Sequence, residues 1–144
     1  MIILTIFGKH SKYNLYYAPD PSSQKVCTIG GNVATNSGGP HTLKYGVTVN
    51  HVLGVEAVLA DGRIVQLGGP AEESPGLDLV GTIVGSEGTL SVVSEAKVRI
   101  VPLPRNKGIL VIQFHSLIEA VEPSQEILEH QPAAIELMDD ASLR

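Results

Sequence analysis

Two apolar, β-branched runs in the middle of the chain flank a turn signal. Residues 55–59 (VEAVL) and 63–67 (RIVQL) stand on either side of Asp61-Gly62. An Asp-Gly pair can take up the positive φ angles of a tight turn between antiparallel strands. The pattern therefore predicts a β-hairpin.

Another strand is predicted where polar and apolar positions alternate. In residues 94–100 (SEAKVRI), Glu95, Lys97 and Arg99 occupy every second position. A period of two places these charges on one face of a strand and leaves the other face for the core. Pro102 has no amide hydrogen, so we expect the strand to end there.

A short helix is predicted between these elements. Ser74 can cap and Pro75 can begin a helix that continues through residues 77–84. Gly81 weakens this helix, and Gly85 is expected to end it.

The last third of the chain opens with a strand pattern followed by a helix pattern. Residues 109–114 form an apolar run suited to a buried strand, and Ser116 and Glu119 have the spacing of a capping box. Pro123 would kink or break the helix that begins there, so we expect two short pieces.

A further strand is predicted at residues 133–138 (AAIELM), and residues 139–144 look like the start of a helix. A strand, a helix and a strand cannot easily enclose a core by themselves. We therefore expect this sequence to be a piece of a larger fold.

The amino terminus is apolar over residues 1–7 (MIILTIF). A membrane-spanning helix needs about 18 or more such residues, and a signal peptide needs basic residues ahead of its apolar stretch. We expect a short strand here, and neither a membrane span nor a targeting signal.

Composition indicates one folded core and excludes some partners. The chain has 144 residues, of which 43% are hydrophobic and 17% charged, with a net charge of −5 and no basic run. Nucleic acid is therefore not an expected partner. Cys27 is the single cysteine, and it is expected to be a small buried apolar residue in a reducing compartment, which favours a cytoplasmic protein.

Glycine is concentrated in one region. Of 15 glycines, 13 lie between Gly30 and Gly88, and residues 28–39 (TIGGNVATNSGG) hold four glycines and no charge. Such a loop can expose backbone amides to an anion, although a set of structural turns would give the same composition. The chain has neither a P-loop nor a dinucleotide-binding fingerprint, so a nucleotide site would be of another kind.

The order and spacing of five segments carry a resemblance to a known family. These segments are APDPSSQ (18–24), TIGGNVATNSGG (28–39), LKYG (43–46), VLADGRIV (58–65) and the run from Asp78 to Pro104. From about residue 16 onward the chain resembles the FAD-linked oxidases. It is most similar to the branch that contains the D-type subunit of glycolate oxidase and the FAD-dependent D-lactate and D-2-hydroxyglutarate dehydrogenases.

The resemblance implies an α+β fold. Residues 16–104 would be the second lobe of a PCMH-type FAD-binding domain, with a mixed or antiparallel sheet and short helices. Residues 105–144 would begin the cap domain that covers the flavin. Residues 1–15 read as an atypical segment, because no motif ahead of Tyr16 matches the family's first lobe.

The resemblance also implies which residues contact FAD, mainly through their backbone. Residues 19–23 would line the flavin side of the cleft, residues 30–39 would follow the pyrophosphate, ribityl chain and ring, and residues 85–88 would lie towards the adenine. The expected contacts are Pro19, Asp20, Pro21, Ser23, Gly30, Gly31, Asn32, Thr35, Asn36, Ser37, Gly38, Gly39, Lys44, Tyr45, Gly46, Glu87, Gly88 and Val93.

No catalytic residue is assigned, because the substrate-binding residues of such enzymes would lie past Arg144. Glu87 is expected to fix its turn or a ribityl hydroxyl rather than act as a base. His41 and His51 could relay a proton or carry a flavin link, but each reads more simply as a hydrogen-bonding residue. No metal site is expected, because no ligand spacing of histidine, cysteine and carboxylate occurs.

Two hypotheses follow from the sequence. In the first, the chain is the FAD-binding portion of an oxidoreductase that oxidises a small 2-hydroxy acid by hydride transfer to FAD. In the second, it is a non-catalytic fragment or interaction module. In either case the chain by itself is expected to be inactive as an enzyme. The expected partners are the 2-hydroxy-acid substrate of the intact relative, and other oxidase subunits or the missing lobe.

Overall fold

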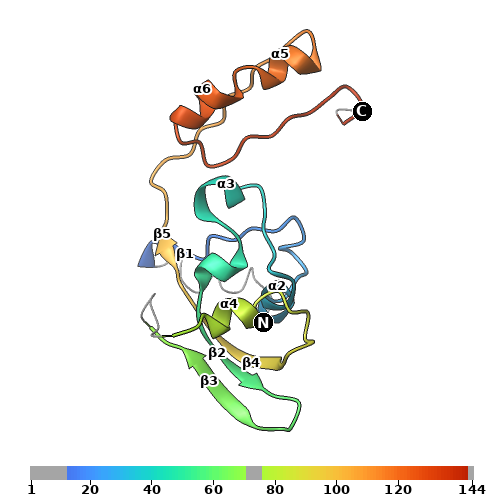
Figure 1. Ribbon diagram of the computed structural model, residues 1–144. Coiled ribbons are helices and arrows are strands. Elements are labelled where there is room, and N and C mark those ends of the chain that lie inside the picture. Colours follow the sequence, from blue (N-terminus) through green and yellow to red (C-terminus); the bar gives the residue numbers. More distant parts are fainter. Residues whose placement is uncertain (1–12, 71–75, 143–144) are drawn as a thin grey trace.

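The protein combines two small antiparallel sheets with short helices, so the predicted α+β class is confirmed (Figure 1). The computed structural model describes residues 13–70 and 76–142. The strands are β1 (Leu15–Tyr16), β2 (Val52–Val58), β3 (Ile64–Gly68), β4 (Val92–Val98) and β5 (Val101–Pro102). The helices are α2 (Ile29–Thr35), α3 (Thr42–Tyr45), η2 (Thr48–His51, a 3₁₀ turn), α4 (Leu79–Ile83), α5 (Leu117–Val121) and α6 (Ser124–Glu129).

The predicted hairpin forms, and its first strand is the centre of a three-stranded sheet ordered β3-β2-β4. Val55 of β2 lies opposite Leu67 of β3 on one side and Ala96 of β4 on the other. At the turn, the amide of Leu59 donates to the carbonyl of Arg63 over 2.9 Å. Gly62 has a φ of +83°, and the Asp61 carboxylate accepts from the Arg63 amide over 3.1 Å.

The strand predicted at residues 94–100 is also present, but it is divided. β4 ends at Val98, and the amide of Arg99 then donates to the carbonyl of His51 over 2.7 Å. The chain continues as β5, in which Val101 lies opposite Tyr16 of β1. Pro102 therefore lies in a two-residue strand that pairs with the start of the described chain.

The glycine-rich stretch was predicted as a loop, and this prediction was wrong for its first half. Thr28 has an extended backbone, and its hydroxyl oxygen accepts from the Gly31 amide over 3.1 Å, which begins α2. Ile29 and Val33, one turn apart, pack into the core. Asn36 ends the helix with a left-handed backbone at φ 50°. The helix forms although it contains two glycines of low helix propensity, because the Thr28 cap, the apolar face of Ile29 and Val33 and the left-handed residue Asn36 stabilise it.

The helix predicted after the hairpin begins later than expected. Asp78 is its N-cap, and the Asp78 carboxylate accepts from the Gly81 amide over 2.7 Å. Ser74 and Pro75 lie outside the described residues. Gly85, with φ +86°, follows the helix and ends it as predicted.

One core lies between α2, α4 and the three-stranded sheet. Its buried members are Val33, Val52, Val55, Ala57, Ile83 and Val84. A smaller cluster surrounds the fully buried Tyr17, and Cys27 packs against that ring as a half-buried residue. β2 is the most buried strand, because it has a neighbour on either side and helices against it.

The carboxyl-terminal part departs from the predicted strands. Residues 109–114 and 133–138 form no strand, and Ile109, Leu110 and Val111 are 93%, 83% and 79% exposed. A strand is stable only when it is paired, and no described segment pairs with either run. At residues 139–142 there is a turn where a helix start was predicted.

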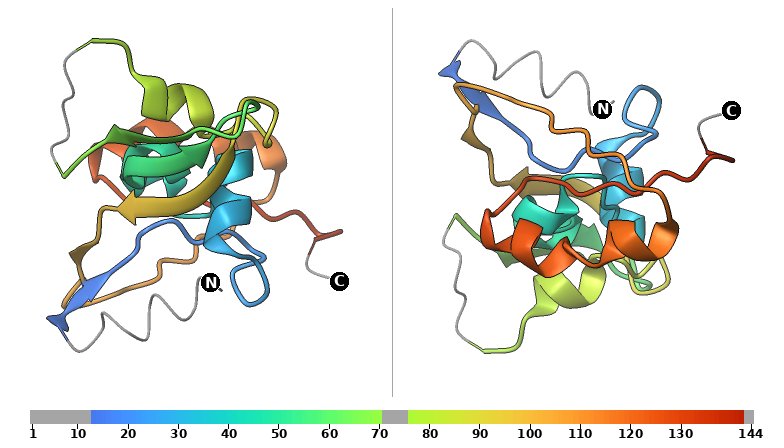
Figure 2. Two further views of the ribbon diagram at one scale, coloured as in Figure 1. Left: turned by 90° about the horizontal axis from the view of Figure 1, so that it is seen from below. Right: turned by 90° about the horizontal axis from the view of Figure 1, so that it is seen from above.

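The split helix is confirmed. The Ser116 hydroxyl accepts from the Glu119 amide over 3.3 Å at the start of α5, and Pro123 is the N-cap residue of α6. Figures 1 and 2 show α5 and α6 one after the other at the end of the molecule away from the three-stranded sheet. The strand predicted at residues 1–7 lies outside the described residues.

We predict that replacing Val33 by Ala lowers the free energy of unfolding by about 1–3 kcal/mol, because the lost methyl groups leave a cavity where α2 meets the sheet. Val33 is fully buried, whereas Val26 is 76% exposed. Urea denaturation of Val33→Ala and of the control Val26→Ala measures the difference. Equal losses in both variants would contradict this core.

Candidate functional site

The end of α2 and the turn at residues 85–88 form one structural unit. The amides of Gly85 and Glu87 donate to the carbonyls of Val33 and Ala34, both over 2.9 Å. A Cβ atom on Gly85 would lie 3.1 Å from the Cβ of Asn36. The structure thus brings together two groups of predicted contacts that are about 50 residues apart in the sequence.

Hydroxyl groups lie beside this unit. The Thr35 hydroxyl donates to the Gly31 carbonyl over 3.0 Å and lies 2.8 Å from the Ser37 hydroxyl. The Ser37 carbonyl in turn accepts from the buried Thr48 hydroxyl over 2.7 Å. Thr35 is exposed and Ser37 half-buried, so this end of α2 presents neutral hydrogen-bonding groups rather than charges.

A second unit joins the segment after β1 to the chain that leads into α3. A Cβ atom on Gly39 would lie only 2.3 Å from the carbonyl oxygen of Asp20, so a side chain there is excluded. The Asp20 carboxylate accepts from the His41 amide over 3.4 Å and contacts the ring Nδ1 of His41 over 2.5 Å. Sequence reasoning named both residues but missed their contact, because 21 residues separate them along the chain.

Aromatic rings lie beside that pair. Tyr16 and Tyr45 meet edge to face with their centroids 6.1 Å apart, and Lys44 Nζ lies 5.7 Å from the Tyr45 ring centroid. Burial, a hydrogen bond with Tyr45 and the nearby charges of Tyr45 and Asp20 raise the pKa of Tyr16. Its hydroxyl therefore stays protonated at neutral pH.

His51 fixes the backbone of the same unit from the inside. The side chain is 1% exposed, and its Nε2 lies 2.8 Å from the Tyr45 carbonyl oxygen, to which it donates. Burial, followed by the charge of Arg99, lowers the pKa of His51, although the Tyr45 carbonyl opposes this shift. A neutral imidazole therefore holds the end of α3, and its ring meets Tyr17 edge to face at 5.9 Å.

The glycines fall into two classes. Gly38, Gly39 and Gly46 are required by the protein itself, because an added Cβ would lie under 3.0 Å from neighbouring atoms. Gly30 has nothing within 4 Å, and Gly31 meets only the Thr28 hydroxyl at 3.4 Å. Both glycines lie in the first turn of α2, and glycine is a poorer helix former than alanine. The fold therefore gives no steric reason for the glycines of α2.

The predicted contacts differ in how far they are exposed. Exposed positions are Ser23, Gly30, Gly31, Thr35, Lys44, Glu87 and Gly88. Half-buried positions are Asp20, Asn36, Ser37, Gly38, Gly39, Tyr45, Gly46 and Val93. Buried positions are Pro19, Pro21 and Asn32. The Asn32 side chain is 2% exposed and its Nδ2 has no hydrogen-bond partner within the described protein.

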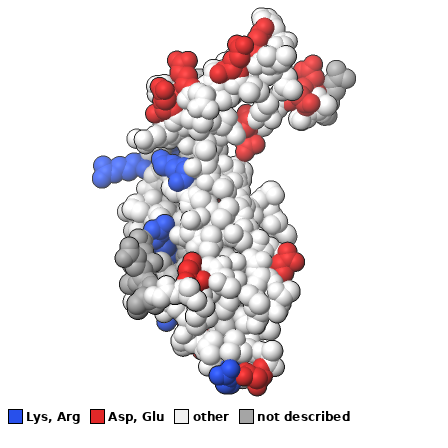
Figure 3. All heavy atoms as spheres, viewed as in Figure 1, with Lys and Arg blue, Asp and Glu red and all other residues white. Residues whose placement is uncertain are grey.

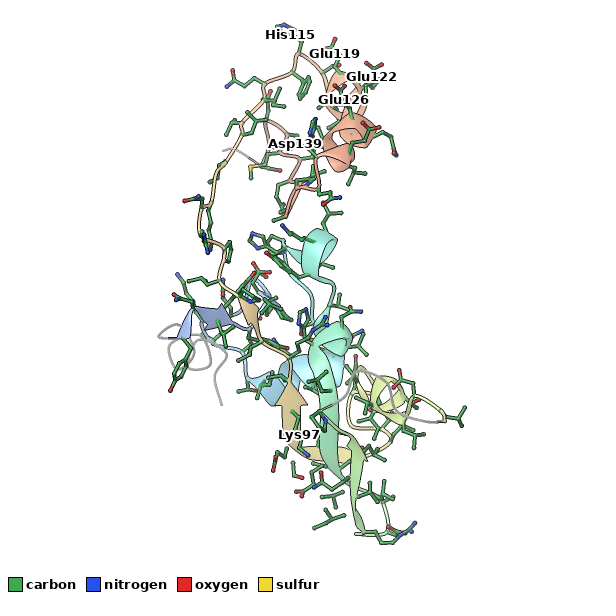
Figure 4. The ribbon with its side chains drawn as sticks, turned by 90° about the vertical axis from the view of Figure 1, so that its left-hand side faces the viewer. Lys97, His115, Glu119, Glu122, Glu126 and Asp139 are labelled. Atoms are coloured by element: carbon green, nitrogen blue, oxygen red, sulfur yellow. The ribbon has the colours of Figure 1, made fainter. Side chains whose placement is uncertain are left out.

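Negative charge gathers elsewhere. Figure 3 shows acidic side chains over the carboxyl-terminal helices, and Figure 4 places Glu119, Glu122 and Glu126 there, whereas Lys97 lies on β4. The carboxyl-terminal end would repel an anionic ligand more strongly than the end of α2, where Glu87 is the single acidic residue of the turn at residues 85–88. Among residues 13–70 and 76–142, no group of three histidine, cysteine or acidic side chains could hold a metal ion, and no helix is long and apolar enough to cross a bilayer.

Comparisons with known proteins decide the family. A model described as FAD binding domain matches residues 3–68. Glycolate oxidase subunit GlcD of Escherichia coli K12 is 46% identical over 143 residues, which cover 98% of this chain and 29% of the relative. Residues 3–68 of this chain belong to that family of FAD binding domains. FAD is thus the cofactor of the family, as the motifs predicted.

Further proteins are similar in sequence to this chain. The GlcD protein of Bacillus subtilis 168 is 46% identical over 99% of this chain and 31% of the relative. D-lactate dehydrogenase of Archaeoglobus fulgidus is 41% identical over 89% of this chain and 29% of the relative. The chain therefore spans about 29–31% of the length of these FAD-linked oxidases. The family match begins at residue 3, so the similarity extends further towards the amino terminus than residue 16, where the motifs placed its start.

Solved structures share the fold. Alkyldihydroxyacetonephosphate synthase superposes with a TM-score of 0.70 at 24% identity, covering 91% of this chain and 25% of the synthase. A second crystal form of that enzyme gives a TM-score of 0.73 and covers 93% of this chain. The α+β fold of this chain is therefore also found in that enzyme.

We predict that the stability of the protein falls with decreasing pH partly through His51. Its folded pKa lies below the unfolded value of about 6.5, so the unfolded chain takes up a proton first as the pH falls. The stabilising effect is complete above that value and is lost below it. Urea denaturation between pH 7.5 and 5.5 should show a smaller decline for His51→Gln than for the wild type. A constant difference between the two across this range would contradict the assignment.

Proposed function

We propose that this chain supplies one wall of the FAD site in an oxidoreductase that oxidises a small 2-hydroxy acid. The relatives' names, glycolate oxidase and D-lactate dehydrogenase, support this substrate class. The observation that carries the proposal is the pair of glycines in α2, which the protein's own packing does not require. In a family of FAD-binding domains, close approach of the cofactor is the simplest reason to keep them.

The wall consists of α2, whose first turn carries Gly30 and Gly31, and of the turn at residues 85–88, which is hydrogen-bonded to the last turn of α2. At Gly30 and Gly31 the absence of side chains lets a large flat ligand approach the main chain. In this proposal the Thr35 and Ser37 hydroxyls hydrogen-bond the ribityl chain or phosphate oxygens of FAD. Since Lys44 is the single lysine or arginine between residues 28 and 60, binding of the diphosphate rests on backbone dipoles and hydroxyls.

The residues of the second unit orient the cofactor rather than react with it. Lys44, Tyr45 and Gly46 close the wall from the side of α3, and residues 19–23 face the flavin. When bound, FAD supplies the chemistry by accepting the hydride from C2 of the substrate. The described part of the chain contributes position and water exclusion.

The proposal extends to domains, partners and location. We assign residues 16–104 to the FAD-binding domain and residues 105–144 to the start of a cap domain. The rest of the wall and the substrate residues would come from other parts of the full-length protein or from other oxidase subunits. We place the protein in the cytoplasm on the strength of its single, half-buried cysteine.

A second candidate function is a non-catalytic interaction module. The exposed apolar residues 109–112 and an open hollow of about 360 Å³ lined by Leu117, Ile118 and Val121 favour it. Exposed apolar residues of this kind are typical of an interaction site. This candidate needs no cofactor.

Binding of FAD separates the two candidates. We expect purified protein to retain flavin absorbance through gel filtration. FAD at about 100 times its dissociation constant should add roughly 2.7 kcal/mol to the free energy of unfolding. Protein that stays colourless and melts at the same temperature with and without FAD would favour the interaction module.

Substitution at Gly30 tests the wall itself. Gly30→Ala places a methyl group in open space within α2, so it should stabilise the FAD-free protein by about 0.4–1 kcal/mol. The same methyl group should weaken FAD binding, because it keeps the cofactor from the backbone. The control is Gly108→Ala, which also meets nothing within 4 Å but lies outside the wall. If Gly30→Ala binds FAD as tightly as the wild type, FAD does not approach the backbone at Gly30, and the proposed wall is contradicted.

A further inference from the structure

The contact between Asp20 and His41 joins two segments that the proposed function places on the same cofactor. Asp20 follows β1 and a short extended segment, and His41 lies just before α3. The carboxylate uses one oxygen for the His41 amide at 3.4 Å and the other for the ring Nδ1 at 2.5 Å. An ionised carboxylate can only accept hydrogen bonds, so Nδ1 must be the donor.

Both members of the pair are partly shielded from water. The Asp20 side chain is 18% exposed and the His41 side chain 45%. Hydrogen bonds to an ionised group are stronger than neutral ones, and shielding reduces competition from solvent. Each carboxylate oxygen of Asp20 thus has a hydrogen-bond partner on His41.

Neighbouring residues show that the Asp20–His41 contact joins residues 16–20 to residues 38–46. Gly39 packs directly on the Asp20 carbonyl, and its amide donates to the Thr42 hydroxyl over 2.8 Å. The Asp20 charge acts on Tyr16, which meets Tyr45 edge to face. Besides this contact, the edge-to-face rings of Tyr16 and Tyr45 and the close approach of Gly39 join residues 16–20 to the chain leading into α3.

We propose that Asp20 is a positioning residue, which acts through His41 to hold residues 38–46 against residues 16–20 before the cofactor binds. This inference rests on the proposed function for its consequence, because residues 38–46 close one side of the proposed FAD wall. A wall that is already ordered loses less conformational entropy on binding, which raises affinity. Asp20 would thus favour FAD binding without contacting FAD through its carboxylate.

Hydrogen exchange of the FAD-free 144-residue protein tests the positioning step by itself. Asp20→Asn keeps the size of the side chain and removes its charge. We expect the amides of residues 38–46 to exchange about tenfold faster in this variant, since their local opening becomes easier. The matched control is Asp61→Asn, which removes a contact of 2.6 Å to Arg63 at the hairpin turn and should leave residues 38–46 unchanged.

Affinity for FAD, measured by titration of the same variants, tests the consequence. We expect Asp20→Asn to bind FAD about tenfold more weakly, and Asp61→Asn to bind like the wild type. The double variant Asp20→Asn/His41→Gln should lose no more than Asp20→Asn, because the two residues act as a unit. Asp20→Glu keeps the carboxylate and should bind more tightly than Asp20→Asn. A role in packing alone would reverse that order, since Asn is closer to Asp in shape.

The outcomes are distinguishable. If the wild type itself binds no FAD, the proposed function is wrong, and hydrogen exchange still decides whether Asp20 orders residues 38–46. If the wild type binds FAD and Asp20→Asn binds equally well, the consequence proposed for Asp20 is overturned and the proposed function stands. Unchanged exchange in Asp20→Asn overturns the positioning role.

Discussion

The arrangement of this protein depends on how the last carbonyl groups of α2 are satisfied. A helix leaves four carbonyls without intrahelical partners at its end. Here the Val33 and Ala34 carbonyls accept hydrogen bonds from the backbone amides of Gly85 and Glu87. The partners of the helix end therefore come from the turn at residues 85–88, which follows α4 in the sequence. Because these bonds are between backbone atoms, they fix the relative position of α2 and the turn whatever the side chains are. The proposed FAD wall depends on this junction, because α2 and residues 85–88 are its two parts.

Burial explains why the junction is stable although α2 has only seven residues. Val33 is fully buried against β2 and α4, and Asn36 directs its side-chain oxygen to the Val49 amide over 2.8 Å. An isolated helix of this length would not persist in water, and two glycines weaken it further. Tertiary packing therefore supplies what local propensity lacks, and it leaves the glycine face of α2 free for another role.

Local signals predicted most of the fold. The Asp61-Gly62 turn, the alternation in β4 and the capping pattern at Ser116 each act over a few residues, and each was found in the structure. The errors share a different cause. Residues 109–114 have the composition of a buried strand, but burial depends on a partner that the pattern does not contain. The helical half of the glycine-rich stretch was missed because glycine content outweighed the Thr28 cap and the spacing of Ile29 and Val33.

The candidate site was predictable only in part, and for the same physical reason. The motifs identified which segments belong together, because a family resemblance preserves order and spacing. They did not show which glycines the protein needs for its own packing, nor that His41 occupies the Asp20 carboxylate. Both facts depend on contacts between residues distant in sequence. Sequence patterns carry no record of such contacts, whereas the coordinates of the folded chain give them directly.

The central claim is that the exposed backbone at the glycines of α2 faces the flavin nucleotide. The most direct measurement is a nuclear magnetic resonance titration of the isotope-labelled protein with FAD, in which each glycine amide reports its own surroundings. We expect the signals of Gly30, Gly31 and Gly88 to shift together in a saturable manner, and those of Gly62 and Gly108 to stay in place. Shifts confined to other regions, or saturable FAD binding that leaves these three signals unmoved, would contradict the claim.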